Sequence, residues 1–463
     1  MAMGKRSGQT QEALFVVMAD LPSTAGHPFY EKLNMALRAI EFDRRLEALC
    51  EPFYDEAGRR SIPPGVYFRM LLIGYFEGID SERGIAWRVA DSRSLGRFLG
   101  YSLTESTPDH SSLSRIRQRL SSDVHAGAFR MVLQALMKAG LVKGKTIGVD
   151  ATTLEANAAM RSIVRRDTGQ SYDAYLEELA KQSGIDEPTR ADLAKLDKHR
   201  KNKGSNHDWE HPHDPDARIT KMKDGRTHLA HKAEHVVDMT AGSCNALLGV
   251  SLHEANKGDT TTGHKSVEEA FDHVAGAIEE VAQLPAGLFE EVVADKGYHS
   301  NDSLLGFAER GMRTQVSEPD RGRRRWKGKA DAKKAVYANR RRVRSERGKR
   351  LQRQRGEKVE RTNAHMYETG GMRRTHLRGH ENILKRLIVH AAGYNLSLLM
   401  RDLFGLGKPR QWQDASKAAR AAFVRAMTRI VMHLMVPMPP VFDLNSLGRH
   451  QNQNSGRITQ VAA

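Results

Sequence analysis

The chain has 463 residues, and its 73 Lys and Arg against 56 Asp and Glu give a formal charge of +17. At about 100–200 residues per domain, this length predicts roughly two to four domains, and a hydrophobic fraction of 39% excludes a wholly disordered chain. The sequence has no run of about 18 apolar residues, which excludes a membrane-spanning helix, and no export signal at its start. Two distant cysteines, Cys50 and Cys244, fit a reducing cytosol. The pI near 9.8 indicates an anionic partner, most often nucleic acid.

Most of the positive charge lies in one stretch. Residues 321–361 hold 19 Lys and Arg against 4 Asp and Glu, a net of +15. Like charges at this density repel one another unless something neutralises them, and DNA phosphates do so with release of counterions. The alternative is a solvated loop or an exposed helix. We take the arginines of this basic segment, bounded at 321–358, as candidate DNA contacts: Arg323, Arg324, Arg325, Arg340, Arg341, Arg342 and Arg355.

Residues 1–135 are predicted to form a helical N-terminal domain. Apolar residues recur there at helical spacing, and Pro64 stands at the first turn of a strongly apolar helix. Ser81 is expected to cap the following helix, and Ser111 or Ser112 a later one.

Two arginines on that later helix, Arg115 and Arg119, are candidate DNA contacts. Several short helices with arginines on the last one are typical of a helix-turn-helix-like unit. The alternative is an ordinary helical bundle.

The pattern changes to mixed α/β over residues 140–400. A polar, charged insertion is expected at about 156–215, with a helix at 172–182, and a helical tail with a frayed end at 405–463. The remaining elements are taken from periodicity and turn residues. The predicted strands are 145–150, 228–240, 245–255, 288–295 and 313–319. The predicted helices are 264–284, 301–309, 357–368, 381–404 and 414–435.

Acidic residues stand at two of the predicted strand ends. Asp150 ends the strand in IGVDATT, and Asp295 ends the strand in VVADKGYHS. Carboxylates on neighbouring strands can bridge divalent cations about 3.5–4 Å apart, which is the arrangement used for phosphoryl displacement. A third carboxylate is expected from the helix RGEKVERTNAHMYE, where Glu357 and Glu360 share a face. Taken singly, each aspartate is better explained as a turn or capping residue. The combination with a helical glutamate and dense basic charge favours a metal site instead.

These motifs resemble the DDE transposases of bacterial insertion sequences, in the broad IS4/IS5 grouping. The resemblance rests on VDATTLEAN at 149–157, VVADKGYHS at 292–300 and VERTNAHMYETGGMRRTHLRG at 359–379, in the family order Asp, Asp, Glu. The helical region with PPGVYFRMLLIGYFEGIDSERGIAWRVADSRSLGRFLG looks like the domain that precedes this catalytic core. The family's Tyr-x2-Arg-x3-Glu-x6-Lys signature is not clean here, so Glu357 stays open as the third acid.

The resemblance implies an RNase H-like catalytic domain with Asp150, Asp295 and Glu360 as catalytic residues and metal ligands. It implies two Mg²⁺ ions, with Mn²⁺ as a substitute, for phosphodiester hydrolysis at the element ends and strand transfer into target DNA. The partners it implies are double-stranded DNA, as terminal repeats and target, and further copies of the chain on that DNA. It also implies a cytoplasmic, nucleoid-associated protein. Further phosphate contacts are expected from Arg373, Arg374 and Arg378.

Two alternatives belong to other classes: an RNase H-like nuclease that cuts without strand transfer, and a catalytically silent DNA-binding regulator. Four polar residues near the second and third strands either support the site or serve as loop and turn residues. They are Asp216, Lys232, Asp238 and Asp259.

Overall fold

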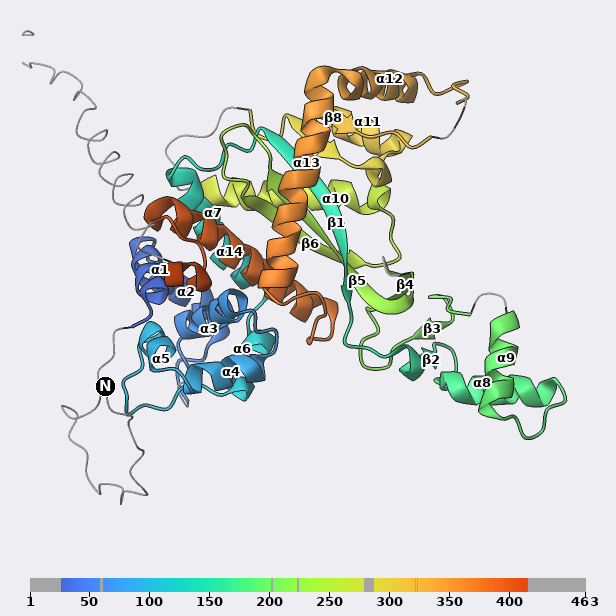
Figure 1. The fold of residues 1–463 in the computed structure, drawn as a ribbon, viewed down its shortest axis with the longest axis horizontal. Coiled ribbons are helices and arrows are strands. Elements are labelled where there is room, and N and C mark those ends of the chain that lie inside the picture. The colour runs from blue at the N-terminus through green and yellow to red at the C-terminus, as the bar shows by residue number, and fades with distance from the viewer. Residues whose placement is uncertain are drawn as a thin grey trace, which may run out of the picture.

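A computed structural model describes residues 26–58, 61–200, 203–222, 225–278, 287–320, 322 and 324–414 (Figure 1). The predicted helix at 414–435, the end of the tail and Arg323 lie outside these residues. Within the described part, no helix is long and apolar enough to cross a membrane.

The N-terminal region is helical, as predicted. Its most apolar helix is buried from Gly65 to Phe76, because it is hydrophobic on every side. Ser81 caps the next helix as expected, whereas Asp109, not Ser111 or Ser112, caps the later one by accepting from the backbone N–H of Ser112. The helices are α1 (Pro28–Ala39), α2 (Phe42–Cys50), α3 (Pro64–Glu77), α4 (Glu82–Ala90), α5 (Arg93–Leu99), α6 (His110–Arg119) and α7 (Ser122–Lys138).

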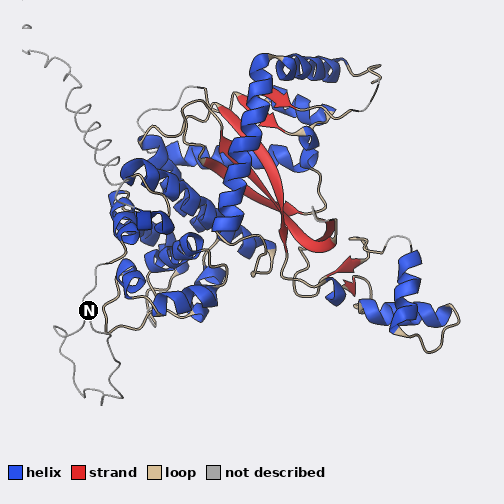
Figure 2. Ribbon diagram, in the orientation of Figure 1, coloured by secondary structure: helices blue, strands red, loops and turns tan. Residues whose placement is uncertain are grey.

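A mixed sheet follows, shown in red in Figure 2. Strand β1 lies at its centre, antiparallel to β5 and parallel to β7. Strand β5 pairs antiparallel with β6 and β4, and β7 pairs parallel with β8. This connectivity is the RNase H-like mixed sheet that the resemblance implies. The strands are β1 (Thr146–Glu155), β4 (Arg218–Lys221), β5 (Thr227–Asp238), β6 (Leu247–Glu254), β7 (Glu291–Ala294) and β8 (Arg313–Val316).

Helices cover both faces of the sheet. In Figure 1, α13 (Glu346–Ala364) crosses in front of the strands and α10 (Asp259–Ile278) lies behind them. Helix α10 begins five residues before the predicted start, at Asp259. Two further helices stand near the β8 edge: α11 (Asn301–Glu309), with the predicted bounds, and α12 (Ala330–Arg344). Most of the basic segment is therefore helical.

Helix α14 (His380–Phe404) joins the helical region to the sheet. It packs on α7, α3 and β6 and is buried almost throughout, again because it is apolar on most sides. One hydrophobic cluster runs from Phe29 in α1 through the sheet to Met400. The two predicted domains thus share a continuous core.

The predicted insertion projects from the sheet at the right of Figure 1. It contains β2 (Val164–Arg165), β3 (Trp209–Glu210), α8 (Tyr172–Gln182), as predicted, and α9 (Arg190–His199). Trp209 is buried against Tyr172 and Tyr175, with ring centroids 4.9 and 5.3 Å away. This segment therefore has a small hydrophobic cluster of its own.

Candidate active site

The first two predicted acids stand side by side on the central strands. In the parallel β1–β7 pair, Gly148 lies opposite Val293. Two residues further along both chains, this register brings Asp150 next to Asp295. Asp295 directly follows β7, as predicted, but Asp150 lies in mid-strand, because β1 continues to Glu155 through its pairing with β5. The expectation that Asp150 ends its strand is wrong.

The Asp150 side chain points toward α13 and is about 20% exposed. Asn363 donates from Nδ2 to its Oδ2 at 3.3 Å. Nη1 of Arg355 lies 3.8 Å from its Oδ1. Helix α13 thus supplies both a hydrogen bond and a compensating charge to this carboxylate.

Glu360 faces the same space as Asp150. Both line a pocket of about 570 Å³, together with Thr152, Asn363 and Arg373 among others. Glu357, in contrast, is 67% exposed and pairs with Arg361 one turn further along the helix, at 3.4 Å. Of the two candidate third acids, Glu360 therefore lies at the pocket and Glu357 at the outer surface of α13.

A neutral pair supports the strand beside Asp150. His235 lies opposite Asp150 in the β1–β5 register, and its Nε2 is 2.8 Å from the hydroxyl of Tyr367. Burial lowers the pKa of His235 to about 3. Burial, and next the nearby Asp150, hold the pKa of Tyr367 well above its usual value. Both groups are uncharged at neutral pH. Neither residue was predicted from the sequence, although His235 shares its strand face with the apolar Ala233 and Val237.

Asp295 is oriented by its own turn. Its Oδ1 accepts from the backbone N–H of Gly297 at 2.8 Å, which caps the 3-10 turn η4 (Lys296–Tyr298). One carboxylate oxygen is thus engaged locally.

The donor set suits a hard divalent cation, because Mg²⁺ prefers carboxylate oxygens and keeps several waters. Within the described part of the chain, however, no group of three or more His, Cys, Asp or Glu side chains is arranged to hold a metal ion. Arg355 lies beside Asp150 instead. The three carboxylates suit a metal ion by chemical type, and the strand register makes Asp150 and Asp295 neighbours. Their side chains would have to move for all three to bind one ion.

Several arginines of the basic segment make internal contacts, among them Arg347, which donates to the buried Glu291 at 2.6 Å. Arg340 donates to both carboxylate oxygens of Glu318, at 2.6 and 2.9 Å, and Arg324 pairs with the same carboxylate at 3.0 Å. Arg342 donates to the backbone oxygen and the hydroxyl of Thr314, both at 2.8 Å. Arg340 and Arg342 fasten α12 to β8 and the turn after it, and Arg324, which precedes α12, holds the same turn. These three predicted DNA contacts therefore make internal contacts in the structure.

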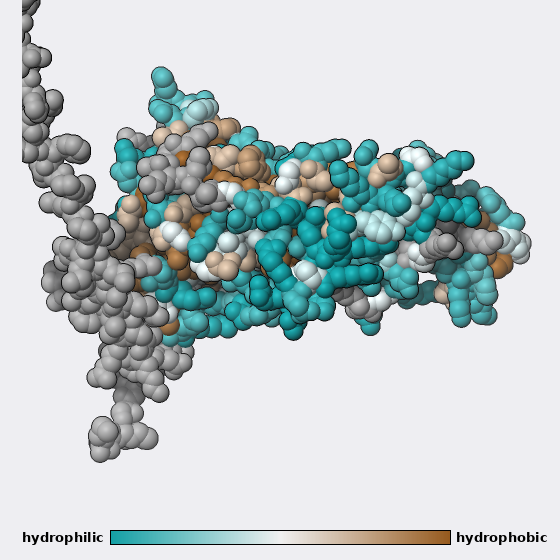
Figure 3. Space-filling model, turned by 90° about the horizontal axis from the view of Figure 1, so that it is seen from above, coloured by the Kyte–Doolittle hydropathy of each residue, from teal (hydrophilic) through white to brown (hydrophobic). Residues whose placement is uncertain are grey.

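Other arginines of this segment face outward. Arg325 and Arg341 are exposed, and so are Arg350 and Arg353 on α13, which the sequence reasoning did not single out. Since α12 and α13 reach the top of Figure 1, they contribute to the face seen from above in Figure 3, where hydrophilic side chains predominate.

The arginines after α13 border the site. Arg373 lines the pocket beside Glu368, its ion-pair partner. Nε of Arg374 lies 3.8 Å from the Glu155 carboxylate at the end of β1, and Arg378 donates to the backbone oxygen of Asn157 at 3.2 Å.

In the helical region, Arg115 and Arg119 are both exposed. Arg115 donates to the Ser111 hydroxyl at 2.8 Å. The guanidinium of Arg119 lies over the Tyr54 ring, 4.8 Å from its centroid.

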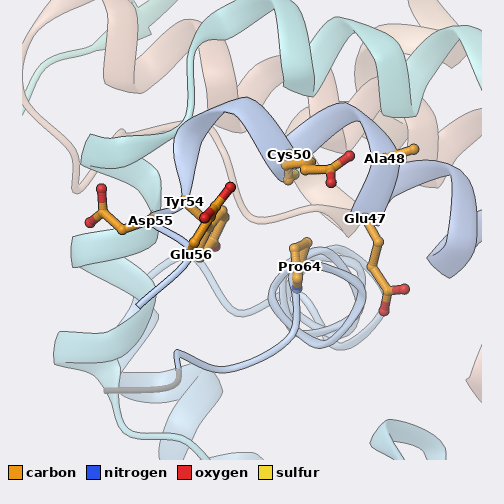
Figure 4. A pocket seen from close by; sticks show the side chains of 8 residues that line it. Glu47, Ala48, Cys50, Tyr54, Asp55, Glu56 and Pro64 are labelled. Atoms are coloured by element: carbon orange, nitrogen blue, oxygen red, sulfur yellow. The ribbon is translucent and has the colours of Figure 1, made fainter. Parts of the chain in front are cut away.

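A second pocket, of about 470 Å³, lies in the helical region between α2 and the start of α3 (Figure 4). Four carboxylates line it, so it repels DNA phosphates. Burial raises the pKa of Cys50, also in its wall, to about 11, which keeps this thiol protonated. The acidic side chains are Glu47, Glu51, Asp55 and Glu56.

Two segments of the chain match known protein families. Residues 21–119, covering α1–α6, match a transposase domain (DUF772), and residues 312–400, from β8 to α14, match a transposase DDE domain. The chain carries matches to two transposase domains, and these support a DDE transposase of an insertion sequence. It is thus a DNA transposase of an insertion sequence, and strand transfer is the standard activity of this family. The family generally uses divalent metal ions. The DDE match includes Glu360, whereas Asp150 and Asp295 lie outside both matched ranges. A comparison with curated proteins gave no match.

Proposed function

We propose that Asp150, Asp295 and Glu360 are the metal ligands with which this transposase cleaves and joins DNA. The proposal is supported by two observations: the β1–β7 register makes Asp150 and Asp295 neighbours, and Asp150 and Glu360 line the same pocket. Asp295 is not among the residues that line this pocket. Two Mg²⁺ ions, when bound there, would supply Lewis-acid activation of water and then of the freed 3′ hydroxyl. Mn²⁺ is expected to substitute.

The residues around the acids have supporting roles in this proposal. Asn363 holds the Asp150 carboxylate toward the pocket. Arg355 balances the charge of Asp150 until the cations do so. Tyr367 and His235, both neutral, leave the carboxylates as the charged groups on this part of the strand.

The DNA partner is expected to run from the pocket along two surfaces. The exposed arginines of α13 lie on one side of it. On the other side, Asp80, between α3 and α4, pairs with His376 at 2.7 Å, which brings the helical region up to the segment that carries Arg373. We propose double-stranded DNA at the element ends and in the target as substrate, bound by more than one copy of the chain. We also propose that the protein acts in the cytoplasm, on the nucleoid, because its DNA substrate would lie there.

The test is a cleavage assay on duplex DNA that spans the end of the element, with and without Mg²⁺. Asp150→Asn, Asp295→Asn and Glu360→Gln should each lower the cleavage rate at least about a hundredfold, because loss of a ligand removes several kcal/mol of transition-state stabilisation. DNA binding should remain. Glu357→Gln, on the same helix but on its outer surface, is the matched control and should cleave like the wild type.

The same assay separates the alternatives. Joining of the cut end to a second duplex indicates a transposase, and cutting without joining indicates the nuclease. A wild-type protein that binds end DNA but never cuts it with Mg²⁺ or Mn²⁺ would be a silent regulator, and the proposal would be wrong. Equal loss in Glu357→Gln and Glu360→Gln would refute the choice of Glu360.

A further inference from the structure

The face of the sheet under α10 contains a buried cluster of charges. Glu234 on β5 is completely buried, and Lys232, on the same strand, is 5% exposed. Nζ of Lys232 lies 2.8 Å from the Glu234 carboxylate, 2.6 Å from that of Asp259 and 2.8 Å from the hydroxyl of Thr262. Ser266 donates to the other oxygen of Glu234 at 2.6 Å. The ammonium is therefore surrounded by acceptors, and both carboxylates are compensated.

Asp259 connects this cluster to the turn that carries Asp295. It is the first residue of α10, and one carboxylate oxygen points to Lys232. The other oxygen lies against Gly297, where a Cβ atom would overlap it and would lie 3.0 Å from Oδ1 of Asp295. Position 297 therefore needs glycine, because carboxylate oxygens of Asp259 and Asp295 lie where a side chain would begin.

The next residue fastens the same turn to α10. The Tyr298 ring lies on Gly263, where a Cβ atom would be 2.6 Å from Cδ1 of the ring. Tyr298 is 1% exposed, and its hydroxyl has no hydrogen-bond partner among the described residues. Burial, and next the carboxylates of Glu234 and Asp259, hold its pKa well above the usual value. The turn after β7 is thus packed on the first two turns of α10 at two consecutive residues.

We propose that Lys232 and Asp259 are positioning residues that hold the Asp295 turn in place for metal binding. This inference rests on the proposed function, in which Asp295 is a ligand. Catalytic groups need placement within about 0.5 Å, and a misplacement of about 1 Å can cost about a hundredfold in rate. A buried ion cluster is a costly way to stabilise a sheet, because apolar residues of similar volume usually serve as well or better. The contact between Asp259 and the Asp295 turn gives this ion cluster a role besides stabilising the sheet.

Three variants test the contact between the Lys232–Asp259 pair and the turn that carries Asp295. They are Lys232→Met, Asp259→Asn and Gly297→Ala. The matched control is Lys257→Met, because Lys257 lies two residues before α10 and its side chain is 53% exposed and pairs with Glu254. Its backbone oxygen, which the substitution keeps, accepts from Lys232 at 3.2 Å. The readout is Mn²⁺ affinity, measured from the free-ion electron paramagnetic resonance signal of the full chain on end DNA, with the thermal midpoint and metal-free DNA binding recorded beside it.

We expect about tenfold weaker Mn²⁺ binding in each of the three variants, unchanged metal-free DNA binding, and wild-type behaviour in Lys257→Met. Because an ammonium cannot ligate a cation, a loss in Lys232→Met identifies positioning rather than ligation. If Lys232→Met does not fold, a double-mutant cycle of Gly297→Ala with Asp259→Ala decides the question. Coupled losses support the contact, and additive losses overturn it.

Asp295→Asn separates this inference from the proposed function. If Asp295→Asn binds Mn²⁺ like the wild type, the proposed function fails. If Asp295→Asn loses affinity while folded Asp259→Asn and Gly297→Ala keep it, the positioning role alone is overturned.

Discussion

The two faces of the sheet differ in how their charged residues are placed: charges are buried and paired under α10, and a carboxylate lines a pocket under α13. Adjacent residues of β5, Glu234 and His235, lie on these two faces. Glu234 points to α10 and is buried within a network of ion pairs and hydrogen bonds. Its neighbour His235 points to the face under α13, where Asp150 opens into a pocket. On the face under α10, Lys232, Glu234 and Asp259 form ion pairs with one another. On the face under α13, Asp150 contacts Asn363 at 3.3 Å and Arg355 at 3.8 Å, is about 20% exposed and lines the pocket.

The largest expected effect on stability comes from breaking the closed face. Glu234→Ala removes the buried carboxylate that Lys232 and Ser266 contact, leaves Lys232 with Asp259 as its carboxylate partner, and should lower the free energy of unfolding by about 3 kcal/mol. Asp150→Asn, on the open face, should lower it by less than about 1 kcal/mol, because surface-accessible pairs contribute little. Urea denaturation followed by circular dichroism measures both. Equal losses in the two variants would contradict the distinction between the faces.

A smaller effect should appear on acidification. Burial lowers the pKa of His235 to about 3 and that of His253, beside Glu234, to about 4. Since both folded-state values lie below the unfolded value of about 6.5, the stabilisation is complete above that pH and is lost as the pH falls toward 4. Each histidine should contribute at most about 1.4 kcal/mol per pH unit.

Urea denaturation at pH 7.5, 6 and 5 tests this dependence. The side chain of His207 is 94% exposed, so His207→Ala should show the same pH profile as the wild type. A stability that does not change between pH 7.5 and 5 would show that the buried histidines titrate normally.

The smallest effects separate inward from outward arginines of the basic segment. Arg353→Ala, on the exposed side of α13, should reduce the salt dependence of DNA binding by about one unit of slope and leave stability unchanged. Arg340→Ala loses two charged hydrogen bonds to Glu318 and should cost about 1.5 kcal/mol of stability. Fluorescence anisotropy against salt and thermal unfolding provide the two readouts. Reversed phenotypes would mean that the inward contacts open when DNA binds.

Local patterns in the sequence predicted much of the fold. The bounds of α8 and α11 follow from their apolar periodicity and from the capping serines, Ser171 and Ser300, that directly precede them. These signals are local in the sequence. The strand–turn–strand at β5 and β6 follows from alternation and from the turn at 241–243.

What could not be predicted depends on contacts between distant segments. The extension of β1 past Asp150 is set by its pairing with β5, about 85 residues away. The inward orientation of Arg340 depends on Glu318 in another segment. From the sequence, Lys232 is either a supporting residue of the site or a loop residue, and Glu234 is not singled out; only the packing of α10 shows that both are buried.

Exchange of each proposed ligand for cysteine tests the central claim most directly. Asp150→Cys, Asp295→Cys and Glu360→Cys replace a hard oxygen donor by a thiolate, which binds Mg²⁺ poorly and softer metals better. The account predicts that each variant fails to cleave end DNA with Mg²⁺ and regains cleavage with Mn²⁺, while Glu357→Cys cleaves with either ion. Folded variants that stay inactive with Mn²⁺, or that cleave normally with Mg²⁺, would contradict direct coordination by these three side chains.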